Sequence, residues 1–144
     1  MSCCHEKAVI KAEKAPKPIG PYSAAIKNGH FVFVSGQTGT IPETGSLVEG
    51  GVEAETRQTL INIQSILEAA GGTLADVVKT TVFLREISEF VKMNAVYAEF
   101  FKEEPPARST FQVVALPRNA AVEIEVIAVM AHCDCKDSDC CCKD

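Results

Sequence analysis

The body of this chain contains no cysteine. All seven cysteines of the 144-residue sequence crowd its two ends, and none lies within residues 5–132. They are Cys3, Cys4, Cys133, Cys135, Cys140, Cys141 and Cys142. Disulfides therefore do not hold the core together, because an odd number of terminal, partly adjacent cysteines makes a poor disulfide framework.

The C-terminal run CDCKDSDCCCKD allows two interpretations. Its thiolates could bind a soft metal such as Zn²⁺ or Cu⁺. The run largely lacks the C-x₂₋₄-C spacing of ordered zinc sites, which favours a tail of reduced thiols without metal. A lysine stands where a prenylation signal needs an aliphatic residue, so the last four residues are not a lipid anchor.

Positive charge and long apolar runs are also scarce. Lys and Arg number 14 against 19 Asp and Glu, which gives a net charge of −5. Phosphate contacts need clustered Lys and Arg, so nucleic acid is an unlikely partner. The N-terminal residues form no apolar signal region, and no later stretch has the length of a membrane span. The sequence predicts a soluble, cytoplasmic protein that does not bind a membrane.

Motifs for cofactors and for nucleophilic catalysis are missing. The sequence contains no phosphate-binding G-x-x-x-x-G-K-[ST], no G-x-G-x-x-G and no H-E-x-x-H. No His, Cys and acid set is placed for nucleophilic catalysis inside the body of the chain. Any chemistry here is therefore expected to run without a cofactor or a metal.

The composition is that of one globular domain. A chain of this length with 47% hydrophobic residues can bury a core without covalent staples. We expect a flexible N-terminal arm over residues 1–15, a folded domain over 16–131 and a cysteine-rich tail over 132–144.

Periodicity and turn signals predict five strands and two helices in the order ββαβαββ. Asn28-Gly29 between two apolar runs is a hairpin signal. Gly71-Gly72 ends one helix, while Ser88 is a candidate N-cap for the other and Pro105-Pro106 ends it. The expected strands are 22–27, 31–37, 77–85, 108–115 and 122–131, and the first helix is 52–70. The fold class is α+β, with both helices on one face of the sheet.

The other face of this sheet is predicted to be apolar as well. Phe31 and Phe33 point to the side opposite Val32 and Val34, because side chains alternate along a strand. Strands that are apolar on both sides need cover on both sides, and two helices on one face cannot supply it. We therefore expect the chain to self-associate through the open face.

Charged residues at strand ends are candidates for a site. Arg108 heads the strand 108–115, and Glu123 and Glu125 share one face of the strand 122–131. If these strands form a hairpin, Arg108 lies far from the turn and does not pair opposite Glu123. A contact would then come through another strand or another subunit. Residue chemistry alone favours solvated strand-end charges over a site.

Seven stretches of the chain, in order, carry a family resemblance. They are IGPYSAAI, FVFVSGQTG, ETRQTLINIQSILEAAGG, VVKTTVFLREISEF, MNAVYAEFF, PPARSTFQVVALP and VEIEVIAV. Together they resemble the Rid/YjgF family, the reactive-intermediate deaminases close to RidA, over residues 16–131. The resemblance implies a chorismate-mutase-like α+β fold and a homotrimer with clefts between subunits. It also implies hydrolysis of 2-aminoacrylate and related enamine or imine acids to a 2-oxo acid and ammonia, with no cofactor.

The resemblance implies roles for individual residues. Arg108 matches an arginine that binds the substrate carboxylate, for which a planar guanidinium fork is suited. Glu123 matches a carboxylate that positions the hydrolytic water. Tyr22 matches a tyrosine that reaches into a neighbouring subunit's cleft, and Ser35 and Asn94 match polar residues that line the site.

Two further positions belong to this set. Gly36 allows close approach to the site. Thr110 stands where a bacterial relative has a cysteine, which excludes a thiol mechanism at that position and can change which substrates fit. Water can add to an imine carbon without a thiol while Arg108 fixes the acid end.

Two other functions stay open at this point. The family also carries an endoribonuclease and translation-inhibitor label, but RNA cleavage needs acid–base pairs and a basic surface that this sequence lacks. The chain could also bind small carboxylates through Arg108 without turning them over.

Overall fold

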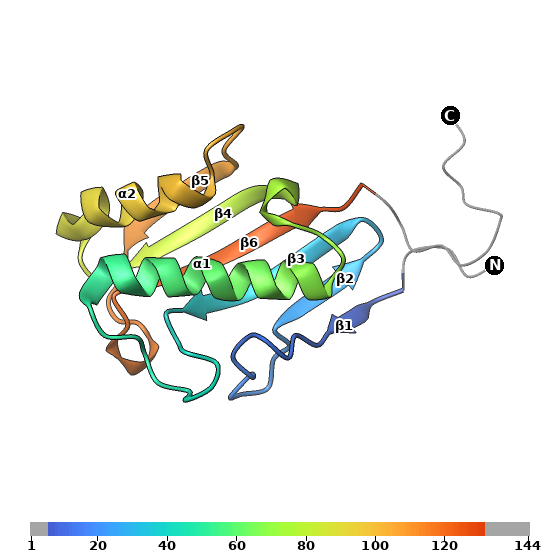
Figure 1. Cartoon of the computed structure of the whole chain (residues 1–144), viewed down its shortest axis with the longest axis horizontal. Coiled ribbons are helices and arrows are strands. Elements are labelled where there is room, and N and C mark those ends of the chain that lie inside the picture. The colour runs from blue at the N-terminus through green and yellow to red at the C-terminus, as the bar shows by residue number, and fades with distance from the viewer. Residues whose placement is uncertain (1–5, 132–144) are drawn as a thin grey trace.

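The computed structural model describes residues 6–131 and consists of one mixed sheet with two helices (Figure 1). Its strands follow the order β1-β2-β3-β6-β4-β5 across the sheet. All neighbours are antiparallel except β4 and β5, which are parallel. The strands are β1 Ala8–Ile10, β2 Ala25–Asn28, β3 Phe31–Thr38, β4 Val77–Leu84, β5 Ala107–Gln112 and β6 Val122–Val129.

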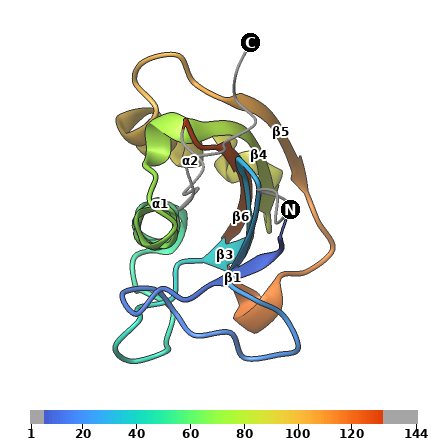
Figure 2. The same cartoon turned by 90° about the vertical axis from the view of Figure 1, so that its right-hand side faces the viewer.

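Both helices cover the same face of the sheet, as expected (Figure 2). The helices are α1 Gly51–Ala69 and α2 Phe90–Phe100, with short 3₁₀ turns at Leu74–Asp76, Ile87–Glu89 and Pro117–Asn119. Helix α1 packs on β3, β6 and α2. Its fully buried side chains include Leu60, Ile63 and Leu67, which recur at helical spacing and form the centre of the core. The α+β fold class is thus confirmed.

Glycines place two of the turns where the sequence predicts them. Gly29 has φ 59 in the two-residue turn between β2 and β3, a conformation that glycine adopts without strain. At the end of α1, Gly71 has φ 89 and donates to the carbonyl of Glu68, while Gly72 donates to the carbonyl of Leu67. This pair of hydrogen bonds is a Schellman motif, which satisfies carbonyls at the helix end.

Three details differ from the expected elements. Residues 8–10 form β1 and pair with β2, so the description of 1–15 as an arm is wrong for this strand. β5 forms no hairpin with β6, because β4 lies between them and pairs with both. Helix α2 begins at Phe90 after a 3₁₀ turn, with Glu89 and not Ser88 in the N-cap position.

The face of the sheet away from the helices carries exposed apolar side chains. Phe31 and Phe33 are 49% and 45% exposed. Val32 and Val34, which alternate with them along β3, are buried under the helices. On β5, Phe111 is exposed and packs edge-on against Phe83 of β4. The alternation predicted for β3 is therefore confirmed, and the single chain leaves these apolar side chains exposed on a face that also carries Lys79, Thr81 and Glu125.

A search of the described residues found no helix with the length and apolar character needed to cross a membrane. The cysteine-rich tail and its candidate metal site lie outside the described residues.

Candidate active site

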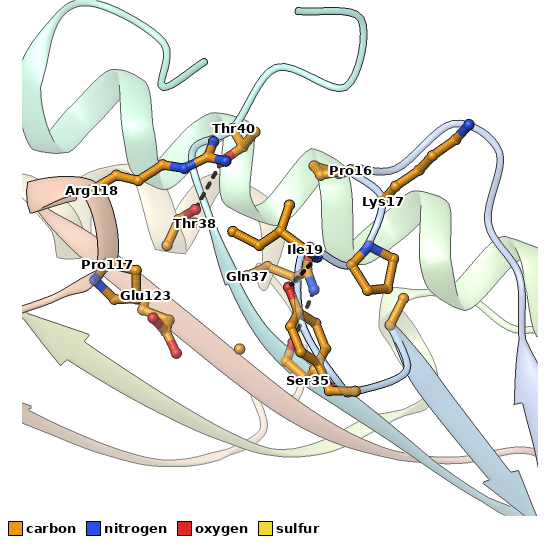
Figure 3. A pocket seen from close by; sticks show the side chains of 14 residues that line it. Pro16, Lys17, Ile19, Ser35, Gln37, Thr38, Thr40, Pro117, Arg118 and Glu123 are labelled. Atoms are coloured by element: carbon orange, nitrogen blue, oxygen red, sulfur yellow. Dashed lines mark hydrogen bonds between the residues drawn. The ribbon is translucent and has the colours of Figure 1, made fainter. Parts of the chain in front are cut away.

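A pocket of about 340 Å³ lies where the segment 16–24, β3, β6 and the turn 117–118 meet (Figure 3). Four of the residues expected in the site line it: Tyr22, Ser35, Gly36 and Glu123. They come from sequence positions about a hundred residues apart, and the β3–β6 pairing brings them together. We call this set the glutamate pocket.

A bulge in β3 forms the floor beneath Glu123. The β3–β6 register shifts by one residue between Val34 and Gln37, so Ser35 and Gly36 have no regular partners on β6. A Cβ added at Gly36 would lie 2.1 Å from Glu123 Oε1 and 2.8 Å from its Cδ. Only glycine therefore leaves room for the carboxylate at this place, which matches the close approach expected of Gly36.

Glu123 is half-buried and lies on the open face of the sheet, between Thr38 of β3 and Phe83 of β4. Burial raises the pKa of its carboxyl above the ordinary value of 4.5, and the like charge of Glu125 raises it further. A carboxylate with a raised pKa is a better proton acceptor than an exposed one, because its ionised form is less well solvated. Glu123 is thus suited to accept a proton from water.

Tyr22 and Ser35 each form a hydrogen bond with a backbone group of the segment 16–24, which lines the pocket. The Ser35 hydroxyl donates to the carbonyl of Ser23 at 2.6 Å, and the backbone N–H of Ile19 donates to the Tyr22 hydroxyl oxygen at 3.3 Å. The Ser35 proton is therefore used inside the chain, where it fixes the segment that carries Tyr22. The Tyr22 ring is 49% exposed, so it lies at the rim of the pocket and is open to a partner.

Two cations line the same pocket and were not expected from the sequence. They are Lys17 and Arg118. Arg118 lies in the turn before β6 with φ 55, and its guanidinium donates to the carbonyl of Gly45. In Figure 3 this guanidinium extends toward Thr40, away from the carboxylate of Glu123. The sequence shows this residue only as part of a turn, so no signal pointed to a pocket.

Arg108 lies on the other face of the sheet. It pairs with Thr80 on β4, which is fully buried under the helices, so its side chain also points to the helix side. Its guanidinium carbon is 4.6 Å from the ring centre of Tyr97 and 5.6 Å from that of Phe90, both on α2. Within residues 6–131 we find no hydrogen bond or ion pair to this guanidinium. Its N–H groups are therefore free to bind an anion.

Asn94 and Thr110 accompany Arg108. Asn94 is four residues after Phe90 and three before Tyr97 on α2, so these three residues lie on one stripe of the helix. Thr110 is on the same side of β5 as Arg108, and its buried Oγ1 has no hydrogen-bond partner within residues 6–131. A hydroxyl without a partner in the chain can pair with water or with a ligand. We call these three residues, Arg108, Thr110 and Asn94, the arginine edge.

The structure does not bring the two sets together in one chain. Glu123 pairs with Phe83, which pairs with Phe111, three residues beyond Arg108 on β5. The two Cα positions are therefore about 14 Å apart in a regular sheet, and their side chains point to opposite faces. The glutamate pocket and the arginine edge of one chain thus face opposite sides of the sheet.

The described part of the chain, residues 6–131, contains no cluster of residues that could hold a metal ion. No group of three or more His, Cys, Asp or Glu residues gathers there. The chemistry that these residues can perform is anion binding by a guanidinium and proton transfer by a carboxylate.

Comparison with known proteins identifies relatives over most of the chain. The profile of the family described as Endoribonuclease L-PSP matches residues 12–130. A RutC family protein of Pyrococcus horikoshii is 54% identical over 85% of this chain and 97% of its own length. The human 2-iminobutanoate/2-iminopropanoate deaminase is 46% identical over 85% of this chain and 90% of its own length.

Solved structures share the fold. RidA from an Antarctic Psychrobacter superimposes with a TM-score of 0.83 at 46% identity, covering 85% of this chain and 99% of the RidA chain. Identity at this level over nearly the whole relative means that fold and family are shared.

Proposed function

The chain belongs to the Endoribonuclease L-PSP family, also called Rid/YjgF, and we propose that it hydrolyses 2-imino acids to 2-oxo acids and ammonia. The observation that carries this proposal is the division of its polar residues into a free guanidinium and a carboxylate of raised pKa. Relatives named as 2-iminobutanoate/2-iminopropanoate deaminases support the reaction class.

Arg108 binds the substrate carboxylate in this proposal. A 2-imino acid carries its carboxylate next to the reacting carbon, so two parallel hydrogen bonds from a guanidinium fix that carbon in place. Asn94 and Thr110 lie beside Arg108 and supply the remaining polar contacts to the bound acid. A threonine at 110 provides a hydroxyl and no thiolate, which is consistent with water as the nucleophile.

Glu123 accepts the proton of the attacking water. As the water oxygen bonds to the imine carbon, the C=N electron pair moves to nitrogen and Glu123 takes the proton. The resulting tetrahedral intermediate carries a hydroxyl and an amine on one carbon. Glu123 returns this first proton to the nitrogen, which completes the amine, and then takes the hydroxyl proton and passes it to the same nitrogen as the C=O bond forms and the C–N bond breaks. One imine and one water thus give one 2-oxo acid and one ammonia.

The reaction requires two copies of the chain. Arg108 and Glu123 point to opposite faces of one sheet, so a substrate can contact both only if they belong to different chains. The open face with Phe31, Phe33 and Phe111 provides an apolar surface for association. We propose a homotrimer, in which the glutamate pocket of each chain faces the arginine edge of its neighbour.

Ribonuclease activity receives less support. The net charge is −5, and the sequence shows no basic stripe for a phosphate backbone. His30, the histidine of the described residues, lies in the β2–β3 turn, whereas Glu123 pairs with Thr38 at the other end of β3. The two are about 25 Å apart along the strand, too far for joint acid–base catalysis on one bond.

The test is ammonia release from 2-iminobutanoate generated in situ, measured for wild type and Arg108→Ala against the spontaneous rate. We expect acceleration by wild type and a loss of ~10²-fold or more in the variant, because carboxylate binding and orientation disappear together. Arg57→Ala is the matched control, since Arg57 pairs with Glu99 on the surface of the helices.

The outcomes separate the candidate functions. No acceleration by wild type contradicts the deaminase. Binding of 2-oxo acids by Glu123→Gln together with loss of turnover supports it, while binding by wild type without any turnover would favour the carboxylate-binding protein. RNA cleavage by wild type that is lost in Arg108→Ala and Glu123→Gln would favour the ribonuclease at this site.

A further inference from the structure

We propose that Tyr97 and Phe90 are positioning residues that hold the Arg108 guanidinium over their rings, and so set the affinity of the site for a carboxylate. The proposal rests on the function above, in which Arg108 is the carboxylate ligand. Tyr97 and Phe90 do not touch the reacting atoms in it.

Tyr97 provides the nearer ring. Its centre lies 4.6 Å from the guanidinium carbon of Arg108, within the range of a cation–π interaction. The ring of Phe90 approaches the same carbon at 5.6 Å. Both rings come from α2, and they flank the position of Asn94 on one stripe of the helix. The side chain of Arg108 thus contacts rings on α2, while the backbone of Arg108 belongs to β5.

Tyr97 itself is held from two sides. Its hydroxyl forms a 2.8 Å hydrogen bond with Thr80 Oγ1, and its ring packs on that of Phe101 at 4.7 Å. Tyr97 is 5% exposed and Thr80 is fully buried. Thr80 is also the residue that pairs with Arg108 across the β4–β5 ladder. The ring and the guanidinium are therefore anchored to the same point of the sheet.

The contact with the two rings lowers the entropy cost of ordering the Arg108 side chain when a carboxylate binds. An arginine without hydrogen-bond partners samples many rotamers, and binding a carboxylate then costs the entropy of ordering it. A ring beneath the guanidinium face restricts the side chain without using any N–H group, because a cation–π contact engages the face and not the edge. The edge that forms bidentate hydrogen bonds remains available.

The experiment measures binding of 2-oxobutanoate by calorimetry, which needs no turnover. Tyr97→Leu removes the ring, Phe90→Leu removes the second ring, and Tyr97→Phe keeps the ring but loses the hydroxyl. We expect about tenfold weaker binding for Tyr97→Leu, a smaller loss for Phe90→Leu and nearly wild-type binding for Tyr97→Phe. Thr80→Val is the matched control for the lost hydrogen bond and should behave as Tyr97→Phe.

A second ligand separates positioning from general destabilisation. The uncharged 2-oxobutanamide lacks the carboxylate, so its weak binding should not change between wild type and Tyr97→Leu. Leu67→Ala serves as the stability control, because Leu67 lies on the buried face of α1. It should lower the melting temperature without changing the ratio of carboxylate to amide affinity.

The possible results are distinguishable. Wild-type affinity for 2-oxobutanoate in Tyr97→Leu contradicts this inference but leaves the proposed reaction intact. Equal losses for the acid and the amide also contradict it, because they indicate a distorted pocket. Absence of carboxylate binding by wild type overturns both proposals. Binding with the expected ratios but no ammonia release contradicts the reaction alone.

Discussion

The position of the Glu123 carboxylate depends on the absence of a side chain at residue 36. Glu123 Oε1 occupies the space where a Cβ at position 36 would stand. The β3 bulge brings Gly36 beneath β6, so the requirement for glycine here is one of volume and not of backbone angle. The positions of Gly36 and of the Glu123 carboxylate are therefore coupled.

Gly36→Ala should therefore lower the turnover of 2-iminobutanoate by ~10²-fold or more, since a displaced carboxylate no longer aligns the water. The measurement is kcat for ammonia release. Gly20→Ala is the control at the same pocket, because a Cβ there meets the Tyr22 ring at an ordinary 3.4 Å. Full activity in Gly36→Ala would contradict the role given to Glu123.

The raised pKa of Glu123 has a consequence for stability. Its folded state binds the proton more tightly than its unfolded state, so the ionised carboxylate destabilises the fold and stability falls as pH rises through the raised pKa. Glu123→Gln removes this cost. We expect a higher melting temperature than wild type at about pH 7, and a difference that shrinks as pH falls through the raised pKa toward 4.5, below which both side chains are neutral.

Thermal melts of the wild type and Glu123→Gln across this pH range provide the measurement. A lower melting temperature of the variant near neutral pH would mean that the carboxylate is stabilised by a partner and not held in a costly environment. Glu125→Gln should have a smaller effect, since Glu125 is exposed.

Residue chemistry alone could not have joined Arg108 to Glu123. The two lie on different faces of one sheet, so neither alternation nor register in a single chain relates them. Only the family resemblance connected them. Tyr97 and Phe90 could have been found from their spacing with Asn94 on the second helix, but nothing in the sequence shows that this stripe meets an arginine.

At the scale of elements, a buried carboxylate joins α1 to the start of β6. Glu55 is 7% exposed, and its Oε2 accepts the backbone N–H of Ala121 at 2.7 Å. Burial raises the pKa of Glu55, while the N–H of Ala121 and the charge of Arg85 oppose that rise. A Cβ at Gly39 would lie 2.7 Å from Glu55 Cα, so helix and strand are in close contact. The first residues of β6, and with them Glu123, depend on this link.

Glu55→Leu should destabilise the fold by about 1–3 kcal/mol, because it leaves the buried N–H of Ala121 without an acceptor. Glu55→Gln keeps an acceptor oxygen and should be close to wild type or above it near neutral pH. Chemical denaturation of the three proteins measures the difference. Equal destabilisation by both variants would show that the charge, and not the hydrogen bond, holds the start of β6.

The elements that sequence patterns predicted well are those with long apolar periodicity. Helix α1 and strands β3, β4 and β6 lie close to their expected ranges. The sequence did not predict β1, because the three residues Ala8–Ile10 are too few to show a pattern and owe their strand geometry to pairing with β2. The sequence did not predict the parallel pairing of β5 with β4 either, because this pairing depends on the path of α2 over the sheet.

At the scale of the whole molecule, the two sets of candidate site residues lie on opposite faces of the sheet. The glutamate pocket lies toward the open face, and the arginine edge lies on the helix side at β5. The exposed Phe31, Phe33 and Phe111 make the open face a poor surface for an isolated chain. In the proposed account, association and catalysis therefore depend on one arrangement, and the site is complete only between two copies.

The most direct test of this account mixes two inactive variants. Arg108→Ala and Glu123→Gln are refolded together from denaturant, and ammonia release from 2-iminobutanoate is compared with each variant refolded alone. If every site takes Arg108 from one chain and Glu123 from its neighbour, random mixing restores about a quarter of the wild-type rate, because half of the chains supply each intact residue. Activity no higher than that of the separate variants would contradict a site shared between chains.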